Sequence, residues 1–199
     1  MPDLNASADP SVSGSTSGAV AVPGADAIAA IRSGMTETPD FPSEGILFRD
    51  LSGLFADAAG LRTVASALVE GFGPIDAVAG VEARGFVLGA AAAVASGNGM
   101  LAVRKAGKLP GEVLNESYAL EYGSASLEVH PSTLPQGARV VIVDDVLATG
   151  GTLTATIRLM ERAGWDVVGV AVVLELVDLG GRAVVEAVTS APVKALLAL

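Results

Sequence analysis

Apolar residues along this chain occur alternately at helical spacing and in short continuous runs. Between residues 57 and 72 they fall on one face of a helix, and residues 75–81 form the continuous run typical of a strand buried on both faces. The same alternation predicts further helices over 84–96 and 151–163 and strands over 100–103, 139–143 and 167–176. Strands that alternate with helices indicate βαβ units. The sequence therefore predicts an α/β fold with a mainly parallel central sheet covered by helices on both faces.

Two segments depart from this alternation. Residues 1–24 are rich in Ser, Gly, Ala and Pro without periodicity, so they bury too little apolar surface to offset the entropy of ordering, and we expect a disordered tail. Residues 105–125 form a long excursion that contains Gly and Pro and ends with hairpin-like spacing, which is typical of a flexible lid. The rest of the chain, residues 25–199, is predicted to form one domain that starts with a short helix near Ala25 and continues through a loop over 39–48.

Charge and cysteine content exclude several classes of function. A net charge of −10 argues against a protein that binds nucleic acid through a broad basic face. The absence of cysteine excludes disulfides, thiolate metal sites and a cysteine nucleophile, and the single His130 cannot supply paired zinc ligands, so we interpret it as structural. The apolar stretches at 86–103 and 167–177 are interrupted or too short to span a membrane, and no signal peptide is recognisable. We expect a cytoplasmic protein without membrane contact.

The most informative segment is residues 140–152, a hydrophobic strand followed by two acids and a turn of small residues into a helix. Asp144 and Asp145 are two hydrogen-bond acceptors at the carboxyl end of the strand and suit the vicinal hydroxyls of a ribose. The turn that follows offers unpaired backbone N–H groups, two hydroxyls and the positive end of a helix dipole, which suit a phosphate monoester; its residues are Ala148, Thr149, Gly150, Gly151 and Thr152. Together these features describe a site for ribose 5-phosphate.

Other interpretations of this segment have less support. Either half alone would fit an ordinary strand-to-helix connection with a good N-cap, but the complete order of strand, acids and small-residue turn fits it poorly. No lysine follows the glycines, as a triphosphate-binding loop would require, and no G-x-G-x-x-G opens a βαβ unit, so nicotinamide and flavin binding have no support.

Basic residues concentrate at two places in this acidic chain. Arg104, Lys105 and Lys108 fall within five positions after one predicted strand, and Arg84 follows another. They predict a local anion site suited to a leaving group that gains negative charge. A solvated charged turn is the alternative interpretation.

Two further groups of residues fit a purine but also have plainer explanations. An aromatic ring beside a guanidinium, as in Phe48 and Arg49, can stack on a purine and bind its edge, yet the residues alone favour a core Phe48 and an Arg49–Asp50 pair. Glu121 in the 105–125 excursion could move a proton at a purine nitrogen, or be one exposed acid of a hairpin.

The segment 140–152 resembles the phosphoribosyl-diphosphate-binding signature of type I phosphoribosyltransferases. From Pro39 to the C-terminus the chain resembles the members of that family that use adenine, with matching blocks in the same order at 40–42 and 45–50, 79–86, 103–105 and 107–111, and 117–118 and 120–123. The resemblance implies the type I fold with a lid hairpin. It also implies an enzyme of purine salvage that transfers the phosphoribosyl group of 5-phosphoribosyl 1-diphosphate to adenine, giving AMP and diphosphate.

The resemblance also implies roles for particular residues. Diphosphate would be bound by Arg84, Arg104, Lys105 and Lys108, and adenine by Leu47, Phe48 and Arg49. Glu121 would act as acid or base on the adenine imidazole, with Arg84 as a second catalytic residue, while Tyr118 and Tyr122 shape the lid. The loop over 82–85 would carry a non-proline cis peptide. Some relatives have a basic residue where this chain has Ser124.

Magnesium and a second subunit are also implied. Mg²⁺ would bind mainly through substrate oxygens, with no protein ligand assigned, and the protein would be a homodimer. Transfer to hypoxanthine, guanine or xanthine, or a non-catalytic regulator that senses phosphoribosyl diphosphate, remain alternative functions at this point.

Overall fold

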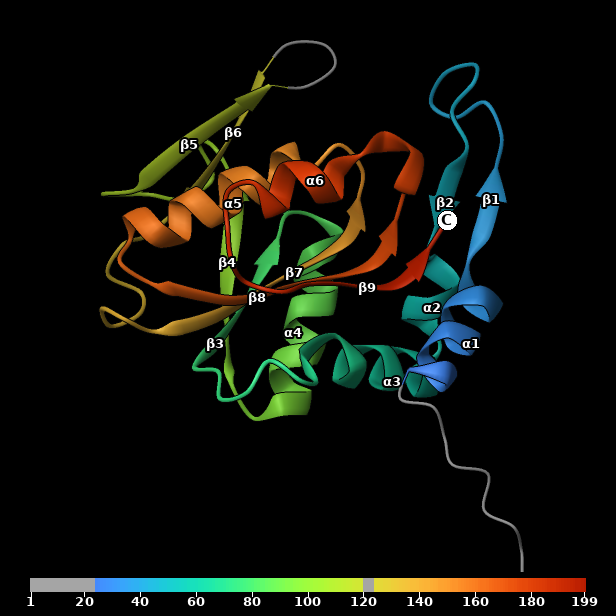
Figure 1. The fold of residues 1–199 in the computed structure, drawn as a ribbon, viewed down its shortest axis with the longest axis horizontal. Coiled ribbons are helices and arrows are strands. Elements are labelled where there is room, and N and C mark those ends of the chain that lie inside the picture. The colour runs from blue at the N-terminus through green and yellow to red at the C-terminus, as the bar shows by residue number, and fades with distance from the viewer. Residues whose placement is uncertain (1–23, 120–123) are drawn as a thin grey trace, which may run out of the picture.

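A seven-stranded sheet forms the centre of the computed structural model, which describes residues 24–119 and 124–199 (Figure 1). The strand order is β5-β6-β4-β3-β7-β8-β9. Strands β4, β3, β7, β8 and β9 pair in parallel, whereas β6 is antiparallel to both β4 and β5. The strand bounds are β3 (Ala77–Val81), β4 (Gly99–Lys105), β5 (Leu114–Ala119), β6 (Ser124–Val129), β7 (Arg139–Leu147), β8 (Asp166–Glu175) and β9 (Val193–Ala198).

Helices cover both faces of this sheet (Figure 1). One face carries α1 (Ala25–Gly34), α2 (Ser52–Ala56), α3 (Ala58–Val69) and α4 (Arg84–Ser96), and the other carries α5 (Gly151–Arg162) and α6 (Gly181–Glu186). A 3-10 turn, η1 (Val177–Leu179), follows β8. The predicted α/β fold with a mainly parallel sheet is confirmed.

Strand β7 shows why its sequence is apolar without interruption. Val140 and Ile142 pack into the core that includes α5, whereas Val141 and Val143 pack into the core that includes α3 and α4. Successive side chains of a strand point to opposite faces, so a strand with helices on both sides needs an apolar residue at every position. The rigid strand fixes the place at which the chain emerges into the turn before α5.

The strand boundaries differ from the prediction at two functional segments. Strand β7 continues to Leu147, so Asp144 and Asp145 lie within the strand instead of beyond its end, because pairing with β8 extends to Leu147↔Glu175. The predicted loop over 39–48 ends in a short strand, β2 (Phe48–Asp50), which pairs with β1 (Thr36–Thr38). This pair stands at the right of Figure 1.

The C-terminal elements α6 and β9 were not predicted from the sequence, and the 105–125 excursion contains a hairpin. Its strands β5 and β6 pair from Leu114↔Val129 to Ala119↔Ser124, and residues 120–123 lie outside the described residues. The predicted tail over 1–24 lies outside them as well, apart from Gly24. Across 24–119 and 124–199, none of the helices has the length and apolar character that crossing a membrane requires.

Candidate active site

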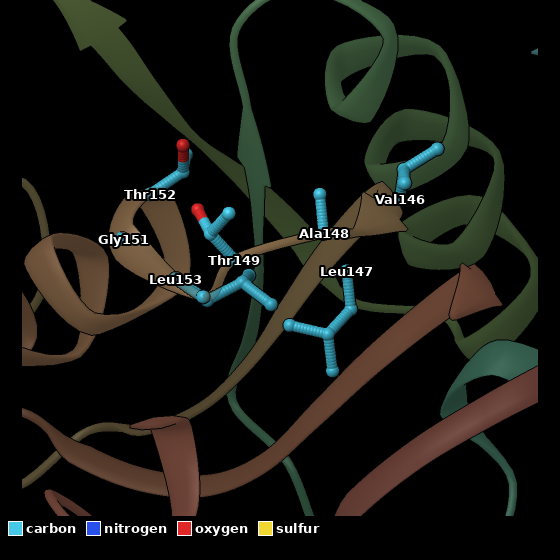
Figure 2. Close-up of a pocket in the computed structure, with 8 residues that line it drawn as sticks. Val146, Leu147, Ala148, Thr149, Gly151, Thr152 and Leu153 are labelled. Carbon is cyan, nitrogen blue, oxygen red and sulfur yellow. The ribbon is translucent and has the colours of Figure 1, made fainter. Parts of the chain in front are cut away.

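The turn from β7 into α5 encloses a small cavity at the N-terminus of that helix. The cavity has a volume of about 60 Å³ and is lined by residues 146–153. The hydroxyl groups of Thr149 and Thr152 point in the same direction from the start of α5 (Figure 2). Because the N-cap residue is Gly150, no side chain caps the first turn, and its N–H groups are available to an anion. Residues 148–152, which we call the phosphate cradle, therefore lie together in a geometry that suits a phosphate monoester.

Close packing against α6 requires glycine in this cradle. Gly150 has a φ of 85°, and a Cβ atom there would lie 2.7 Å from the carbonyl oxygen of Gly181. A Cβ atom on Gly181 would lie 2.1 Å from the carbonyl oxygen of Ala148. The start of α6 thus packs against the cradle and supports it. Gly181 was not predicted to belong to the site, because the pair Gly180-Gly181 indicates a turn but not which residues the turn contacts.

Asp144 and Asp145 lie side by side on β7, ahead of the cradle. Each is only 8% exposed. The Asp145 backbone N–H donates a hydrogen bond to Oδ1 of Asp144 at 2.9 Å. Burial, and then repulsion from Asp145, raise the pKa of Asp144 well above its ordinary value. Hydrogen-bond donors or a cation that reach this pair would therefore stabilise its charged form.

Arg84, the first residue of α4, connects this acidic pair with the aromatic residues of β2. Its Nη2 lies 2.8 Å from Oδ2 of Asp145, and its Nη1 donates a hydrogen bond to the carbonyl oxygen of Arg49 at 3.2 Å. The guanidinium carbon lies 5.5 Å from the centroid of the Phe48 ring. Arg84 follows the Glu82–Ala83 peptide bond, which is cis, as the resemblance implied. The structure thus brings a residue predicted to bind diphosphate between the predicted ribose and base residues.

A second cavity lies beside Arg84. It has a volume of about 190 Å³ and is lined by Ile46, Leu47, Phe48, Arg49, Arg84, Val146 and Leu176. Phe48 is half-buried and meets Phe41 edge to face, with ring centroids 5.1 Å apart. We call this second cavity the aromatic pocket. Val146 lines it and also lines the cavity at the phosphate cradle, so the two cavities are neighbours. Their arrangement gives a nucleoside monophosphate a place for its ring at one end and its phosphate at the other.

The alternative interpretation of Phe48 and Arg49 does not fit these contacts. Phe48 lines the cavity instead of filling the core. Arg49 pairs with Glu37 of β1, where Nε lies 3.1 Å from Oε1, and not with Asp50, which accepts hydrogen bonds from Ser52. Two pocket residues, Val146 and Leu176, could not be identified from the sequence, because an apolar side chain carries no chemical signal of its own.

The predicted basic residues lie near the loop over 82–85. Nε of Arg104 lies 3.1 Å from Oε2 of Glu82, and the same oxygen accepts the Lys105 backbone N–H at 2.9 Å. Lys105 and Lys108 are exposed. The structure therefore places Arg104 and Lys105 beside the segment that carries Arg84, with Lys108 on the loop that follows. The sequence did not predict that Glu82 connects the 82–85 loop with Arg104 and Lys105.

The predicted lid residues are only partly described. Tyr118 of β5 is half-buried and packs against the core on the α5 side of the sheet. Glu121 and Tyr122 lie outside the described residues. The hairpin root is tied to α5 by Arg162, whose Nη1 donates to the Asn115 carbonyl oxygen at 2.6 Å and lies 2.8 Å from Oε2 of Glu116.

Asp144 and Asp145 supply too few ligand atoms to hold a metal ion by themselves. Among the residues that the structure describes, no group of three or more histidines or acids is placed to ligate one ion. Asp144 and Asp145 fit a magnesium ion only if most of its ligands come from a substrate or from water, which is how Mg²⁺ is commonly held beside phosphates.

Comparison with known sequences gives a consistent family. The phosphoribosyl transferase domain family matches residues 55–186. Adenine phosphoribosyltransferase from Clavibacter sepedonicus is 65% identical over 162 residues, covering 81% of this chain and 85% of the relative. The enzyme of the same name from an Arthrobacter strain is 59% identical, covering 81% and 86%.

Solved structures agree with the sequence relatives. Adenine phosphoribosyltransferase from Saccharomyces cerevisiae, crystallised with an imino-altritol bisphosphate and adenine, is 38% identical, with a TM-score of 0.79 and coverage of 86% of this chain and 98% of that one. The enzyme from Rhodothermus marinus is 44% identical, with a TM-score of 0.79 and coverage of 87% and 98%.

The packing of α6 behind the cradle predicts the effect of Gly181→Ala. The new Cβ atom would push the Ala148 carbonyl from its place, so we expect the dissociation constant for ribose 5-phosphate, measured by calorimetry, to rise at least about tenfold, since shifts of about 1 Å in a site have such costs. Gly99→Ala is the matched control, because a Cβ atom there meets nothing within 4 Å. Unchanged affinity in Gly181→Ala would show that α6 does not support the cradle.

Proposed function

This chain belongs to the adenine phosphoribosyltransferases of the phosphoribosyl transferase domain family, and we propose how its residues carry out the reaction of that family. The enzyme transfers the phosphoribosyl group of 5-phosphoribosyl 1-diphosphate to adenine and releases AMP and diphosphate. The observation that carries the assignment of residues is the row formed by the phosphate cradle, the buried acidic pair, Arg84 and the aromatic pocket at one edge of the sheet.

The cradle and the acidic pair together hold the ribose 5-phosphate portion. The 5-phosphate accepts hydrogen bonds from the N–H groups at the start of α5 and from the hydroxyls of Thr149 and Thr152. Asp144 and Asp145 accept hydrogen bonds from the two ribose hydroxyls. Burial raises the pKa of Asp144, and hydrogen bonds from the ribose hydroxyls act in the opposite direction because they favour its ionised form.

The aromatic pocket holds adenine. The purine stacks on Phe48, the Leu47 backbone binds its edge, and Arg49 reaches a ring nitrogen. Val146 and Leu176 supply apolar lining to the same pocket. Arg84 lies over the same Phe48 ring, with its guanidinium carbon 5.5 Å from the ring centroid, so it is close to the place proposed for the base.

Arg84, Arg104, Lys105 and Lys108 bind the diphosphate. When the ribose hydroxyls engage Asp145, the guanidinium of Arg84 exchanges that carboxylate for a diphosphate oxygen. Such pairing with an anion whose charge grows during bond breaking stabilises the transition state more than the ground state. Mg²⁺, bound mainly through diphosphate and ribose oxygens, would add positive charge at the leaving group.

Bond cleavage at the anomeric carbon builds positive charge on the ribose, as in glycoside hydrolysis. No covalent nucleophile is needed, because the site holds adenine and the anomeric carbon in line. Glu121 acts as acid or base on the imidazole nitrogen of adenine. The β5–β6 hairpin, with Tyr118 and Tyr122, closes over the site and excludes water. A cytoplasmic homodimer completes the proposal, in which the partner subunit contributes to the binding of the diphosphate.

The choice of base is tested by offering the enzyme phosphoribosyl diphosphate and magnesium with one base at a time. We expect AMP from adenine, and at least about a hundredfold lower kcat/KM with hypoxanthine, guanine or xanthine, because a buried group that is left unpaired costs about 1–3 kcal/mol and these bases differ at more than one position. Efficient use of another base would contradict the pocket assignment. Binding of phosphoribosyl diphosphate without turnover of any base would instead identify a regulator.

The role of Glu121 predicts that Glu121→Ala lowers kcat about a hundredfold or more, the usual contribution of a general acid or base. The dissociation constant for phosphoribosyl diphosphate should change little, because the carboxylate acts on the other substrate. Glu112→Ala, at an exposed position of the same excursion, is the control. Equal losses in kcat and in phosphoribosyl diphosphate binding would remove Glu121 from the acid–base role.

The diol assignment predicts that Asp144→Asn and Asp145→Asn each raise the KM for phosphoribosyl diphosphate by about tenfold or more, since hydrogen bonds to a charged group contribute about 1.5–3 kcal/mol. Steady-state kinetics with saturating adenine measure this effect. Asp166→Asn, an exposed acid at the opposite end of the neighbouring strand β8, should have no effect. An unchanged KM in both site variants would rule out the diol role.

A further inference from the structure

Glu128 of β6 binds three consecutive backbone N–H groups of the loop that follows β4. Its Oε2 accepts a hydrogen bond from Gly107 at 3.0 Å, and its Oε1 accepts two, from Lys108 and Leu109, each at 2.6 Å. The residue is only 2% exposed. A buried carboxylate surrounded by successive backbone N–H groups occupies the position that a bound anion takes in a nest.

Glu128 is ionised in this environment. Burial acts to raise the pKa of its carboxyl group, but the three backbone N–H groups and the positive charge of Arg104 outweigh it and lower the pKa below its ordinary value. Arg104 is the direct cross-strand partner of Glu128 in the β4–β6 pair. The charge of Glu128 is therefore compensated within the protein and does not repel an anion strongly.

Every backbone N–H group from Lys105 to Leu109 has an acceptor inside the protein. Lys105 donates to Glu82 at 2.9 Å, Ala106 donates to the Ser126 carbonyl oxygen at 2.9 Å, and the next three donate to Glu128. The loop thus offers an anion no backbone donors. Only its side chains remain for recognition, and Lys105 and Lys108 are the exposed cations among them.

We propose that Glu128 is a positioning residue for the diphosphate end of the site: it fixes the 105–109 loop so that Lys105 and Lys108 extend toward the leaving group. This inference rests on the proposed function, in which those lysines contact diphosphate. A carboxylate is suited to the task because its two oxygens accept several N–H groups at once, whereas a neutral side chain accepts fewer. Glu128 touches no substrate atom and acts only through the loop.

The test compares Glu128→Ala and Glu128→Gln with Glu116→Gln in the full-length enzyme. Glu116 belongs to the same hairpin and contacts Arg158 and Arg162 of α5, so its variant removes one carboxylate from the hairpin without touching the loop. The probes are magnesium diphosphate and adenine, each titrated alone, followed by steady-state kinetics for both substrates. Hydrogen exchange at Gly107, Lys108 and Leu109 reports on the loop itself.

We expect Glu128→Ala to raise the dissociation constant for magnesium diphosphate and the KM for phosphoribosyl diphosphate by about tenfold or more, with adenine affinity within about twofold of wild type. Exchange at the three amides should accelerate at least tenfold. Glu128→Gln keeps an oxygen for Lys108 and Leu109 but presents an N–H₂ group to Gly107, so its effects should be intermediate. If Glu128→Ala does not fold, the same measurements on Glu128→Gln test the proposal. Glu116→Gln should match wild type in magnesium diphosphate affinity and in exchange at the three amides, because Glu116 does not contact the 105–109 loop.

Two results would overturn the inference. Equal losses for both substrates, or faster exchange without any change in diphosphate binding, would mean that Glu128 only stabilises the fold. Lys108→Ala and Lys105→Ala separate this failure from that of the proposed function. If the lysine variants weaken diphosphate binding and the Glu128 variants do not, the positioning role alone is wrong. If neither lysine variant affects diphosphate binding, the loop has no part in the site and the positioning role falls with it.

Discussion

The site depends on two carboxylates that are buried next to each other near the carboxyl end of β7. Asp144 and Asp145 are consecutive residues of a strand with helices on both faces, and each is only 8% exposed. Arg84 compensates their mutual repulsion, since its Nη2 lies 2.8 Å from Oδ2 of Asp145. Arg84 in turn contacts Phe48 and the backbone of Arg49. A single ion pair therefore connects the residues that we propose to bind ribose, diphosphate and base, and a ligand that engages the acids would compete with Arg84 for Asp145.

The two segments that we propose to bind phosphate groups use their backbone N–H groups in opposite ways. At the start of α5 no side chain caps the helix, so its N–H groups suit the proposed 5-phosphate, which remains attached to the ribose throughout the reaction. In the 105–109 loop Glu82, Glu128 and a carbonyl group accept every backbone N–H group, so in our proposal the diphosphate is bound by the exposed side chains of Lys105 and Lys108. A rigid cradle suits the group that must stay in place.

The sequence predicts the parts of this fold that obey a local pattern and misses those that depend on tertiary contacts. The unbroken apolar run of β7 requires helices on both faces, and the acids and glycines that follow it form a site with residues adjacent in the chain, so both were predicted. By contrast, β2 is three residues long and pairs with β1, and β7 extends to Leu147 only because β8 pairs with it there. Glu128 binds residues 19–21 positions away, and no local pattern announces such a contact.

The base pocket shows the same limit in a more general form. Phe48 and Arg49 have side chains with recognisable chemistry, so they could be nominated, although their immediate neighbours favoured a structural role. Val146 and Leu176 line the same cavity and have no such chemistry. What makes them part of the site is that parallel strands β7 and β8 end at one edge of the sheet, so the residues near their carboxyl ends meet there. The base pocket that we propose therefore depends partly on side chains whose place is set by topology alone, and a substitution at Val146 would act on both cavities at once.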